Sequence, residues 1–435
     1  MRRAIVYGAC AAAFLLLGCK AAFAGSEVKI DTGDTAWVLC SSAMVLLMTP
    51  GLSLFYAGMV RRKNALGTIL HSFILVGIVG ALWVLYGYSL AFGKDHGGLI
   101  GSLDWLGMSG VGGEPYAPYS KTIPHQAFAI FQMMFAIITP ALITGAFAER
   151  MRFKAFVLFG VLWATVVYLP IAHWVWAPGG WIREMGALDF AGGLVVHLSS
   201  GVAALVCAVV IGRRKGYGRE EFTPHNLTMT LVGTGLLWFG WFGFNAGSAL
   251  GANATACGAF LATNTAGSVA AVTWMVVEWL HRGKPTALGA ATGGVAGLAA
   301  VTPASGFIGP GPAMLIGLVA GLVCYGAVML KGRFGYDDSL DVFGVHGVGG
   351  IWGVLATGLF ASVAVNPAGA NGLFYGGAAL LGKQALAMLA VGGFSIVMTY
   401  ILLKVTGAIT SLRVEKDDEE TGLDLSQHGE VGYSL

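Results

Sequence analysis

The sequence predicts an all-α polytopic membrane protein: eleven transmembrane helices, built as two inverted five-helix repeats around a central pore. The first observation is composition, because 56% of the 435 residues are hydrophobic and only 11% are charged, whereas soluble domains carry about 25% charged residues. The second is a succession of apolar stretches, and the third is the alternation of basic residues between the intervening loops. The net charge of +3 is too small to indicate a nucleic-acid partner.

The chain begins with a predicted signal peptide at residues 1–24. Met-Arg-Arg forms a basic start, residues 11–17 form an apolar run, and Ala-Phe-Ala at 22–24 is a small-x-small cleavage site. The alternative is a lipoprotein signal that ends at Cys19, because Leu-Leu-Gly precedes that cysteine. Both interpretations place the mature N-terminus outside the cytoplasm.

A transmembrane domain is predicted over residues 25–407. A helix needs about 20 apolar residues to cross a hydrocarbon core about 30 Å thick, and eleven stretches approach or exceed that length. They lie at 35–59, 65–92, 126–147, 154–176, 191–212, 227–249, 256–280, 286–304, 311–330, 342–364 and 384–407.

The loop charges give this domain an orientation. Cytoplasmic loops carry an excess of Lys and Arg, and here every second loop is basic. The basic loops contain Arg61, Arg62, Lys63, Arg150, Arg152, Lys154, Arg213, Arg214, Lys215, Arg219, Arg282, Lys284, Lys331 and Arg333. The other loops contain few basic residues: Lys94, Lys121, Arg183 and Lys383. We therefore expect a multi-pass protein of a bacterial inner membrane, surrounded by lipid, with a periplasmic N-terminus and a cytoplasmic C-terminus.

Two histidines at membrane depth are the main functional candidates. His197 ends the stretch DFAGGLVVH, about 12 Å along the helix axis from Asp189 at 1.5 Å per residue. His346 lies in DVFGVHGVGG, five residues after Asp341. They fall in the last helices of the two predicted repeats, and inverted repeats place their site between the halves. Ionisable residues at this depth mark a pathway by default, although a single buried histidine is more often a hydrogen-bonded core group.

Asp189 has a structural and a functional interpretation. An aspartate just before a helix accepts backbone N–H groups as an N-cap, which contributes about 1 kcal/mol. We favour this role, in which Asp189 starts the fifth helix beside Gly192 and Gly193. Its charge near the outer mouth would also attract a cation.

Aromatic side chains are dense in the outer halves of three predicted helices. An interfacial belt explains most tryptophans in membrane proteins, so composition alone does not choose between a belt and a cation site. The residues are Phe131, Phe135, Trp174, Trp176, Trp241 and Phe244, with Ser248 following the last of them.

The sequence gives no sign of a metal, a cofactor or an enzyme. The six cysteines are scattered, without a CxxC pair or a Cys/His cluster. A membrane enzyme that used His197 and His346 with a metal would lack nearby carboxylate or cysteine ligands.

Five motifs resemble those of the Amt/Mep/Rh ammonium transporter family, of the bacterial Amt type. They are GAFAERMRF, PIAHWVW, DFAGGLVVH, GWFGFNAGS and DVFGVHGVGG. The similarity runs from about residue 35 to the tail at 422–433. It implies a homotrimer with one ammonium-conducting pore in each eleven-helix subunit, acting as a channel or transporter in nitrogen metabolism.

The resemblance also implies roles for the aromatic residues. Phe135 and Trp176 would hold ammonium by cation–π contacts, with Phe131 beside them and Ser248 accepting a hydrogen bond. Phe135 would also form a stacked phenyl gate with Phe244.

Deeper in the pore, the resemblance implies that Trp241 lines the path. His197 and His346 would be twin pore histidines that are hydrogen-bonded to each other, and Asp189 would support the recruitment site from behind.

Elementary energetics agree with these roles. A desolvated cation over an aromatic face gains about 2 kcal/mol, whereas an unpaired ion in a dry, low-dielectric pore costs tens of kcal/mol by Born estimates. Desolvation therefore favours the neutral form, so ammonium is expected to lose a proton and cross as ammonia. Potassium has no proton to lose and is excluded by the same step.

Residues 408–435 form a predicted cytoplasmic regulatory tail with an acidic run at 415–420. The resemblance implies that it packs against the basic loops and helps to bind a P-II type nitrogen regulatory protein; the alternative is a solubilising end without a partner. For the whole chain, the alternatives are an ammonium sensor that acts through its cytoplasmic face and an Rh-like pore for other small neutral solutes such as methylamine or carbon dioxide.

Overall fold

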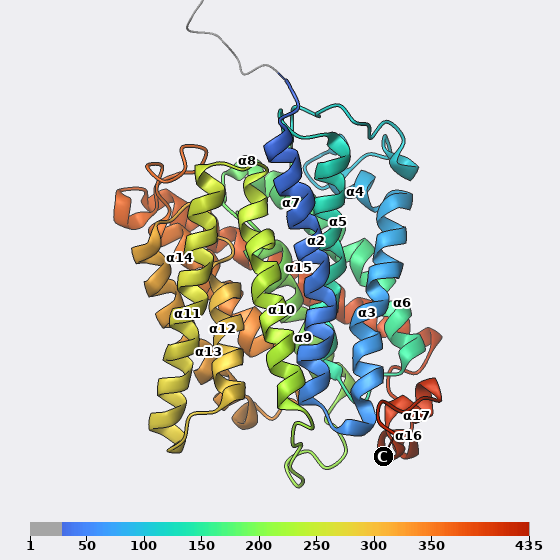
Figure 1. Cartoon of the computed structure of the whole chain (residues 1–435). Coiled ribbons are helices and arrows are strands. Elements are labelled where there is room, and N and C mark those ends of the chain that lie inside the picture. Colours follow the sequence, from blue (N-terminus) through green and yellow to red (C-terminus); the bar gives the residue numbers. More distant parts are fainter. Residues whose placement is uncertain (1–27, 435) are drawn as a thin grey trace, which may run out of the picture.

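The computed structural model describes residues 28–434 as a bundle of long helices, with its longest connection at residues 93–124 (Figure 1). The predicted signal peptide at 1–24 lies outside the described residues. Following the predicted topology, we call the end of the bundle where Thr32 lies the outer end, and the opposite end the inner end.

The helices of the bundle belong mostly to its membrane-spanning segments. They are α2 (Thr32–Met59), α3 (Ala65–Leu82), α4 (Tyr88–Phe92), α5 (His125–Ile143), α6 (Phe153–Trp163), α7 (Leu169–Trp176), α8 (Trp181–Met185), α9 (Ser199–Ile211), α10 (Leu227–Ala246), α11 (Ala254–Arg282), α12 (Ala287–Val301), α13 (Pro310–Phe334), α14 (Val348–Phe360), α15 (Ala378–Ile409), α16 (Lys416–Thr421) and α17 (Leu423–His428). A short antiparallel hairpin lies in an outer loop; its strands, of two residues each, are β1 (Asp95–His96) and β2 (Ile100–Gly101).

The predicted spans agree with the observed helices, except that one observed helix is shorter than its predicted span. Ten helical segments within residues 28–434 are long and apolar enough to cross a membrane. The remaining predicted span, 286–304, contains the shorter apolar helix α12. The chain turns after Val301 instead of continuing as a regular helix.

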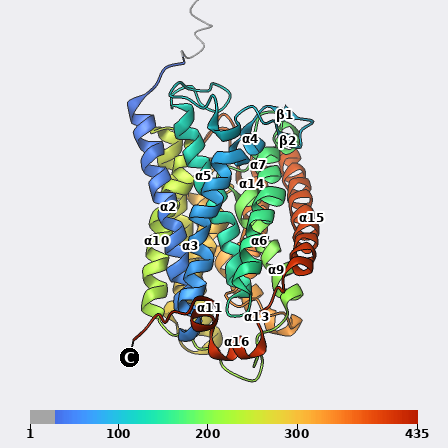
Figure 2. The same cartoon turned by 90° about the vertical axis from the view of Figure 1, so that its right-hand side faces the viewer.

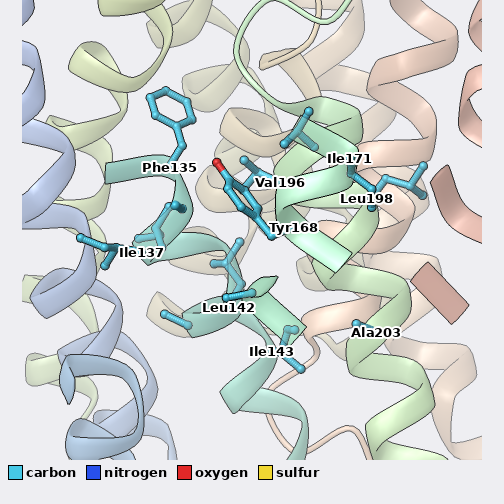
Figure 3. Close-up of a cluster of buried hydrophobic side chains, with 14 of the residues drawn as sticks. Phe135, Ile137, Leu142, Ile143, Tyr168, Ile171, Val196, Leu198 and Ala203 are labelled. Carbon is cyan, nitrogen blue, oxygen red and sulfur yellow. The ribbon is translucent and has the colours of Figure 1, made fainter. Parts of the chain in front are cut away.

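Wide π-helical turns precede the last helix of each repeat. The turn η6 (Gly193–Leu198) leads into α9 and contains His197, and η8 (Phe343–Gly347) leads into α14 and contains His346. Such turns are rare and are frequent at functional sites. Figure 3 shows the core beside η6, where Tyr168 and Ile171 lie near Val196.

Glycines allow the two repeats to cross in close contact. A Cβ atom on Gly201 would lie 2.2 Å from the backbone nitrogen of Gly347, so neither position has room for a side chain. Small residues permit this approach between helices in lipid. The first helices of the two repeats, α2 and α10, also pack together. The first helix of one repeat thus contacts the first helix of the other, and the last helix contacts the last, as expected for two inverted repeats.

The tail returns to the inner end of the bundle. Figure 2 shows α16 lying across that end, and α17 packs against α3. The tail therefore lies on the same face as the basic loops.

Candidate functional site

An aromatic pocket of about 180 Å³ opens at the outer end of the bundle. Phe135 from α5 and Trp176 from the end of α7 form two of its walls, with their rings at 89° and their centroids 5.6 Å apart. Ser248 lines the same pocket and donates its hydroxyl proton to the carbonyl of Phe244 at 2.8 Å. The lone pairs of the Ser248 oxygen therefore remain available to a donor in the pocket.

Two stacked phenyl rings lie below the pocket. The rings of Phe135 and Phe244 are 4.2 Å apart between centroids and inclined by 26°. Phe131 packs edge-on against Phe135 at 5.0 Å, and all three side chains are buried. The rings thus separate the outer pocket from the interior.

A narrow apolar space follows on the inner side of the phenyl rings. Its volume is about 10 Å³, about that of one water-sized molecule. Trp241 lines it, fixed by a 2.9 Å hydrogen bond from its indole N–H to the hydroxyl of Thr302. The ring of His197 stacks on Trp241, with centroids 5.4 Å apart.

The two histidines meet in this space. Their imidazole rings are nearly parallel, inclined by 15°, with centroids 5.3 Å apart. The expected hydrogen bond between them is not formed, which corrects the prediction. Both ring nitrogens of His197 and the Nδ1 atom of His346 lack a hydrogen-bond partner among the described residues. Stacking, not a shared proton, sets their relative position here.

Asp189 caps the turn that carries His197. One carboxylate oxygen accepts the N–H groups of Gly192 and Gly193 at 2.8 and 2.6 Å, and the other accepts those of Leu194 and Val195 at 2.7 and 3.2 Å. A carboxylate so engaged does not face the outer pocket, so the capping interpretation fits its geometry.

The backbone near Asp189 also positions Trp176. The indole N–H of Trp176 donates to the carbonyl oxygen of Asp189 at 3.0 Å. Gly192 ends the loop with φ of 112°, a left-handed conformation that favours glycine. The pocket wall and the start of the histidine turn are therefore one connected unit.

The equivalent cap before His346 is Asp338, which the sequence analysis missed. The carboxylate of this buried residue accepts the N–H of Phe343 at 2.8 Å, and burial raises the pKa of Asp338 to about 6. The signal was present, because Asp338 precedes His346 by eight residues, as Asp189 precedes His197. Asp341, which the sequence analysis paired with His346, instead forms an ion pair with Lys331.

Gln132 and Arg183 are among the residues of the outer pocket that the sequence analysis missed. The side-chain oxygen of Gln132, a polar residue inside a span, is buried without a hydrogen-bond partner. Arg183 from α8 lines the pocket rim. Gln132 was detectable as a polar residue in an apolar run, whereas nothing in the sequence joins Arg183 to Trp176.

A larger cavity of about 460 Å³ opens on the inner side of the histidines. Val345 and His346 line it, as do the Lys331–Asp341 pair and Trp274. The three spaces follow one another through the bundle. Phe135 of the outer pocket stacks on Phe244 of the narrow space, and His346 lines both the narrow space and the inner cavity. They form one path through the bundle, interrupted at the phenyl rings.

Buried ion pairs join the basic loops at the inner end. Glu149, with φ of 72°, pairs with Arg61 at 3.0 Å and with Arg214 at 3.2 Å. Arg214 also pairs with Asp337 at 2.8 Å. Although burial opposes it, the guanidinium groups of Arg214 and Arg61 hold the pKa of Glu149 below its ordinary value.

The tail docks on these same loops. Asp424 accepts the N–H groups of Leu66 and Gly67 at the start of α3, at 3.1 and 2.8 Å. Glu419 pairs with Arg413 at 2.7 Å and accepts the N–H of Lys215 at 2.6 Å. The packing that the resemblance implied for the tail is confirmed.

The chain is similar over nearly its whole length to known transporters. Residues 36–433 match the Ammonium Transporter Family. An ammonium transporter of Bacillus subtilis is 54% identical over 405 residues, which cover 93% of this chain and 99% of that protein. Ammonium transporter Amt1 of Archaeoglobus fulgidus is 49% identical, with 93% and 100% covered.

Solved structures give the same result. The crystal structure of Saccharomyces cerevisiae Mep2 has a TM-score of 0.83 to this chain at 37% identity, covering 89% of this chain and 88% of that one. A structure described as "Sensor Amt Protein" has a TM-score of 0.84 at 29% identity, covering 91% and 98%. The chain therefore belongs to the Ammonium Transporter Family, and it is a multi-pass membrane transporter rather than an enzyme.

Proposed function

We propose that the protein carries ammonium across the bacterial inner membrane by recruiting the cation outside, removing a proton and conducting neutral ammonia. The order of three features carries this proposal. An aromatic pocket lies on the outer side of the stacked phenyl rings, and an apolar space that contains both histidines lies on their inner side. The printed names of the relatives, ammonium transporters, agree with it.

Recruitment uses the outer pocket. The faces of Phe135 and Trp176 attract a cation, and the hydroxyl oxygen of Ser248 and the amide oxygen of Gln132 accept N–H groups. Ammonium has four N–H donors, so it can use both acceptors while it contacts the rings. A metal cation of the same charge makes no N–H hydrogen bonds there.

Conduction uses the narrow space. A charged species entering a space of about 10 Å³ lined mainly by apolar side chains loses its hydration. Ammonia needs only hydrogen-bond partners, and the unpaired nitrogens of His197 and His346 offer them. Potassium stops at the phenyl rings because it has no neutral form.

The remaining assignments complete this proposal. Residues 1–24 are a cleaved signal peptide, 25–407 the transporter domain and 408–435 the regulatory tail. The N-terminus is periplasmic, the C-terminus is cytoplasmic, and three copies form a homotrimer with one pore each. The basic inner loops support the orientation.

The recruitment step predicts the effect of Trp176→Leu. Loss of a desolvated cation–π contact should raise the KM for ammonium uptake by about five- to thirtyfold. Initial uptake rates in proteoliposomes, measured over a range of ammonium chloride concentrations, test this. Trp279→Leu is the matched control, because Trp279 is exposed on α11. An unchanged KM in Trp176→Leu would assign Trp176 to the interfacial belt.

A sensor is the second candidate function. The 29% identical structure described as a sensor favours it, as does the docked tail, whose state could report on the pore. Transport that persists in the reconstituted protein without any partner favours the transporter.

We also propose that a P-II type protein binds the inner face and blocks the exit. The docked acidic tail beside basic loops supports this, because together they present an ordered, charged surface. Binding would respond to cellular nitrogen status through the partner.

This proposal predicts the outcome of a pull-down from nitrogen-replete cells. Full-length protein should recover a P-II protein, and protein without residues 412–435 should recover at least tenfold less. Asp424→Ala, which removes the two hydrogen bonds to the start of α3, should fall between them. Recovery of no P-II protein by any form contradicts the proposal, and equal recovery by all forms moves the contact to the loops.

A further inference from the structure

A guanidinium group lies on the wall of the outer cation pocket. Arg183, in α8, lines the same cavity as Phe135 and Trp176. One of its terminal nitrogens donates a hydrogen bond to the backbone carbonyl of Trp176. The Arg183 side chain is exposed, and this hydrogen bond holds its guanidinium group at the rim of the cavity.

No carboxylate compensates this charge within residues 28–434. None lies within ion-pair distance of Arg183, since the ion pairs formed by the described chain involve other residues. The neighbouring Glu184 accepts the N–H of Gly179 at 3.2 Å, and Asp189 is occupied by four backbone N–H groups. The pocket therefore contains an uncompensated positive group.

The Tyr119 hydroxyl is a second group of the pocket that interacts electrostatically with Arg183. Burial, with a smaller contribution from Tyr116, raises the pKa of the Tyr119 hydroxyl, and the Arg183 guanidinium partly offsets that rise. Both Tyr119 and Arg183 line the cavity in which ammonium is proposed to bind.

A fixed positive charge beside a cation site opposes the binding of ammonium. We propose that Arg183 promotes proton release from ammonium in the outer pocket, an inference that rests on the proposed function. A nearby like charge disfavours the charged form of a titrating group. One N–H bond of ammonium breaks, its electron pair stays on nitrogen, and the proton passes to a water molecule at the outer mouth. The neutral ammonia no longer interacts with the charge and moves toward the phenyl rings.

The size of the effect follows from the dimensions of the pocket. A cavity of 180 Å³ is about 7 Å across, and two unit charges at about that distance near a protein surface change an equilibrium by roughly three- to thirtyfold. Removing the charge should therefore tighten ammonium binding by this factor and slow the release of its proton.

Two substitutions separate charge from hydrogen bonding. Arg183→Gln keeps an N–H donor for the Trp176 carbonyl and loses the charge, and Arg183→Lys keeps both. In proteoliposomes with ammonium chloride as the probe, Arg183→Gln should lower KM by about three- to thirtyfold and also lower the maximal rate. Arg183→Lys should stay within about twofold of the wild type. Lys383→Gln removes an exposed charge from a side chain that does not line the pocket and should change neither value.

The outcomes are decisive. An unchanged or raised KM in Arg183→Gln overturns the inference, as does an equal change in Arg183→Gln and Arg183→Lys, which would assign Arg183 to fixing Trp176. Equal thermal stability of the variants in detergent excludes misfolding as the cause. Failure of the proposed function itself would be seen separately, as absence of ammonium-dependent uptake by the wild type.

Discussion

Replacing either pore histidine by alanine should reduce selective ammonium uptake by roughly tenfold to a hundredfold, with a folded protein remaining. Without one imidazole, ammonia in the narrow space loses a hydrogen-bond partner, and an unsatisfied buried polar group costs about 1–3 kcal/mol. Both His197 and His346 lie in this space, so both variants should show the effect. Initial uptake rates in proteoliposomes, with potassium as the competing cation, measure it.

The control for this prediction is His96→Ala, because His96 is exposed in the outer hairpin. His197→Gln and His346→Gln provide a graded test, since an amide offers a donor and an acceptor. They should retain more uptake than the alanine variants. Wild-type rate and selectivity in both alanine variants would remove the histidines from the mechanism.

Asp189→Ala should destabilise the protein by about 3–5 kcal/mol and abolish transport, because it leaves buried backbone N–H groups without acceptors. Asparagine is a good N-cap residue, so a cap that used only one oxygen would tolerate Asp189→Asn. The four hydrogen bonds change that expectation, because asparagine has one oxygen and would lose the pair of acceptor contacts made by the other. Asp189→Asn should therefore lie between the wild type and Asp189→Ala.

Thermal unfolding in detergent and uptake in proteoliposomes measure the two effects of Asp189 separately. Asp104→Asn, at an exposed position of the outer loop, is the control. A stable, fully active Asp189→Asn protein would contradict the four-bond cap. A stable but inactive one would show that the negative charge has a role of its own.

The sequence was sufficient for most of the helical spans, because lipid imposes length and polarity rules that can be read locally. It also singled out two histidines, 149 residues apart in the chain, whose rings lie together in the structure. Trp176, Phe135 and Ser248 lie around one pocket as the resemblance implied. Asp338 was missed for a different reason: the nearer Asp341 attracted attention, although the equal spacing of eight residues pointed to Asp338.

Features that depend on three-dimensional contact could not be predicted from the sequence. The π-helical turns at His197 and His346 lie next to the close approach of Gly201 and Gly347, which no local sequence pattern specifies. The parallel stacking of the histidines depends on that close approach. Arg183 reaches the pocket rim from the short helix α8, and its contact with the Trp176 carbonyl depends on how the chain folds between the two residues.

The stacked pair of Phe135 and Phe244 has a kinetic consequence. An aromatic pair of this kind contributes about 0.5–1.5 kcal/mol, so separating the rings at a cost of about 1 kcal/mol leaves them open roughly one time in six. Side-chain rotations of this kind begin on the picosecond to nanosecond scale in exposed residues and are slower in packed ones. Such a barrier opens and closes by thermal motion alone, without a signal or a bound effector. Its effect is to keep a continuous column of water from forming between the outer pocket and the narrow space.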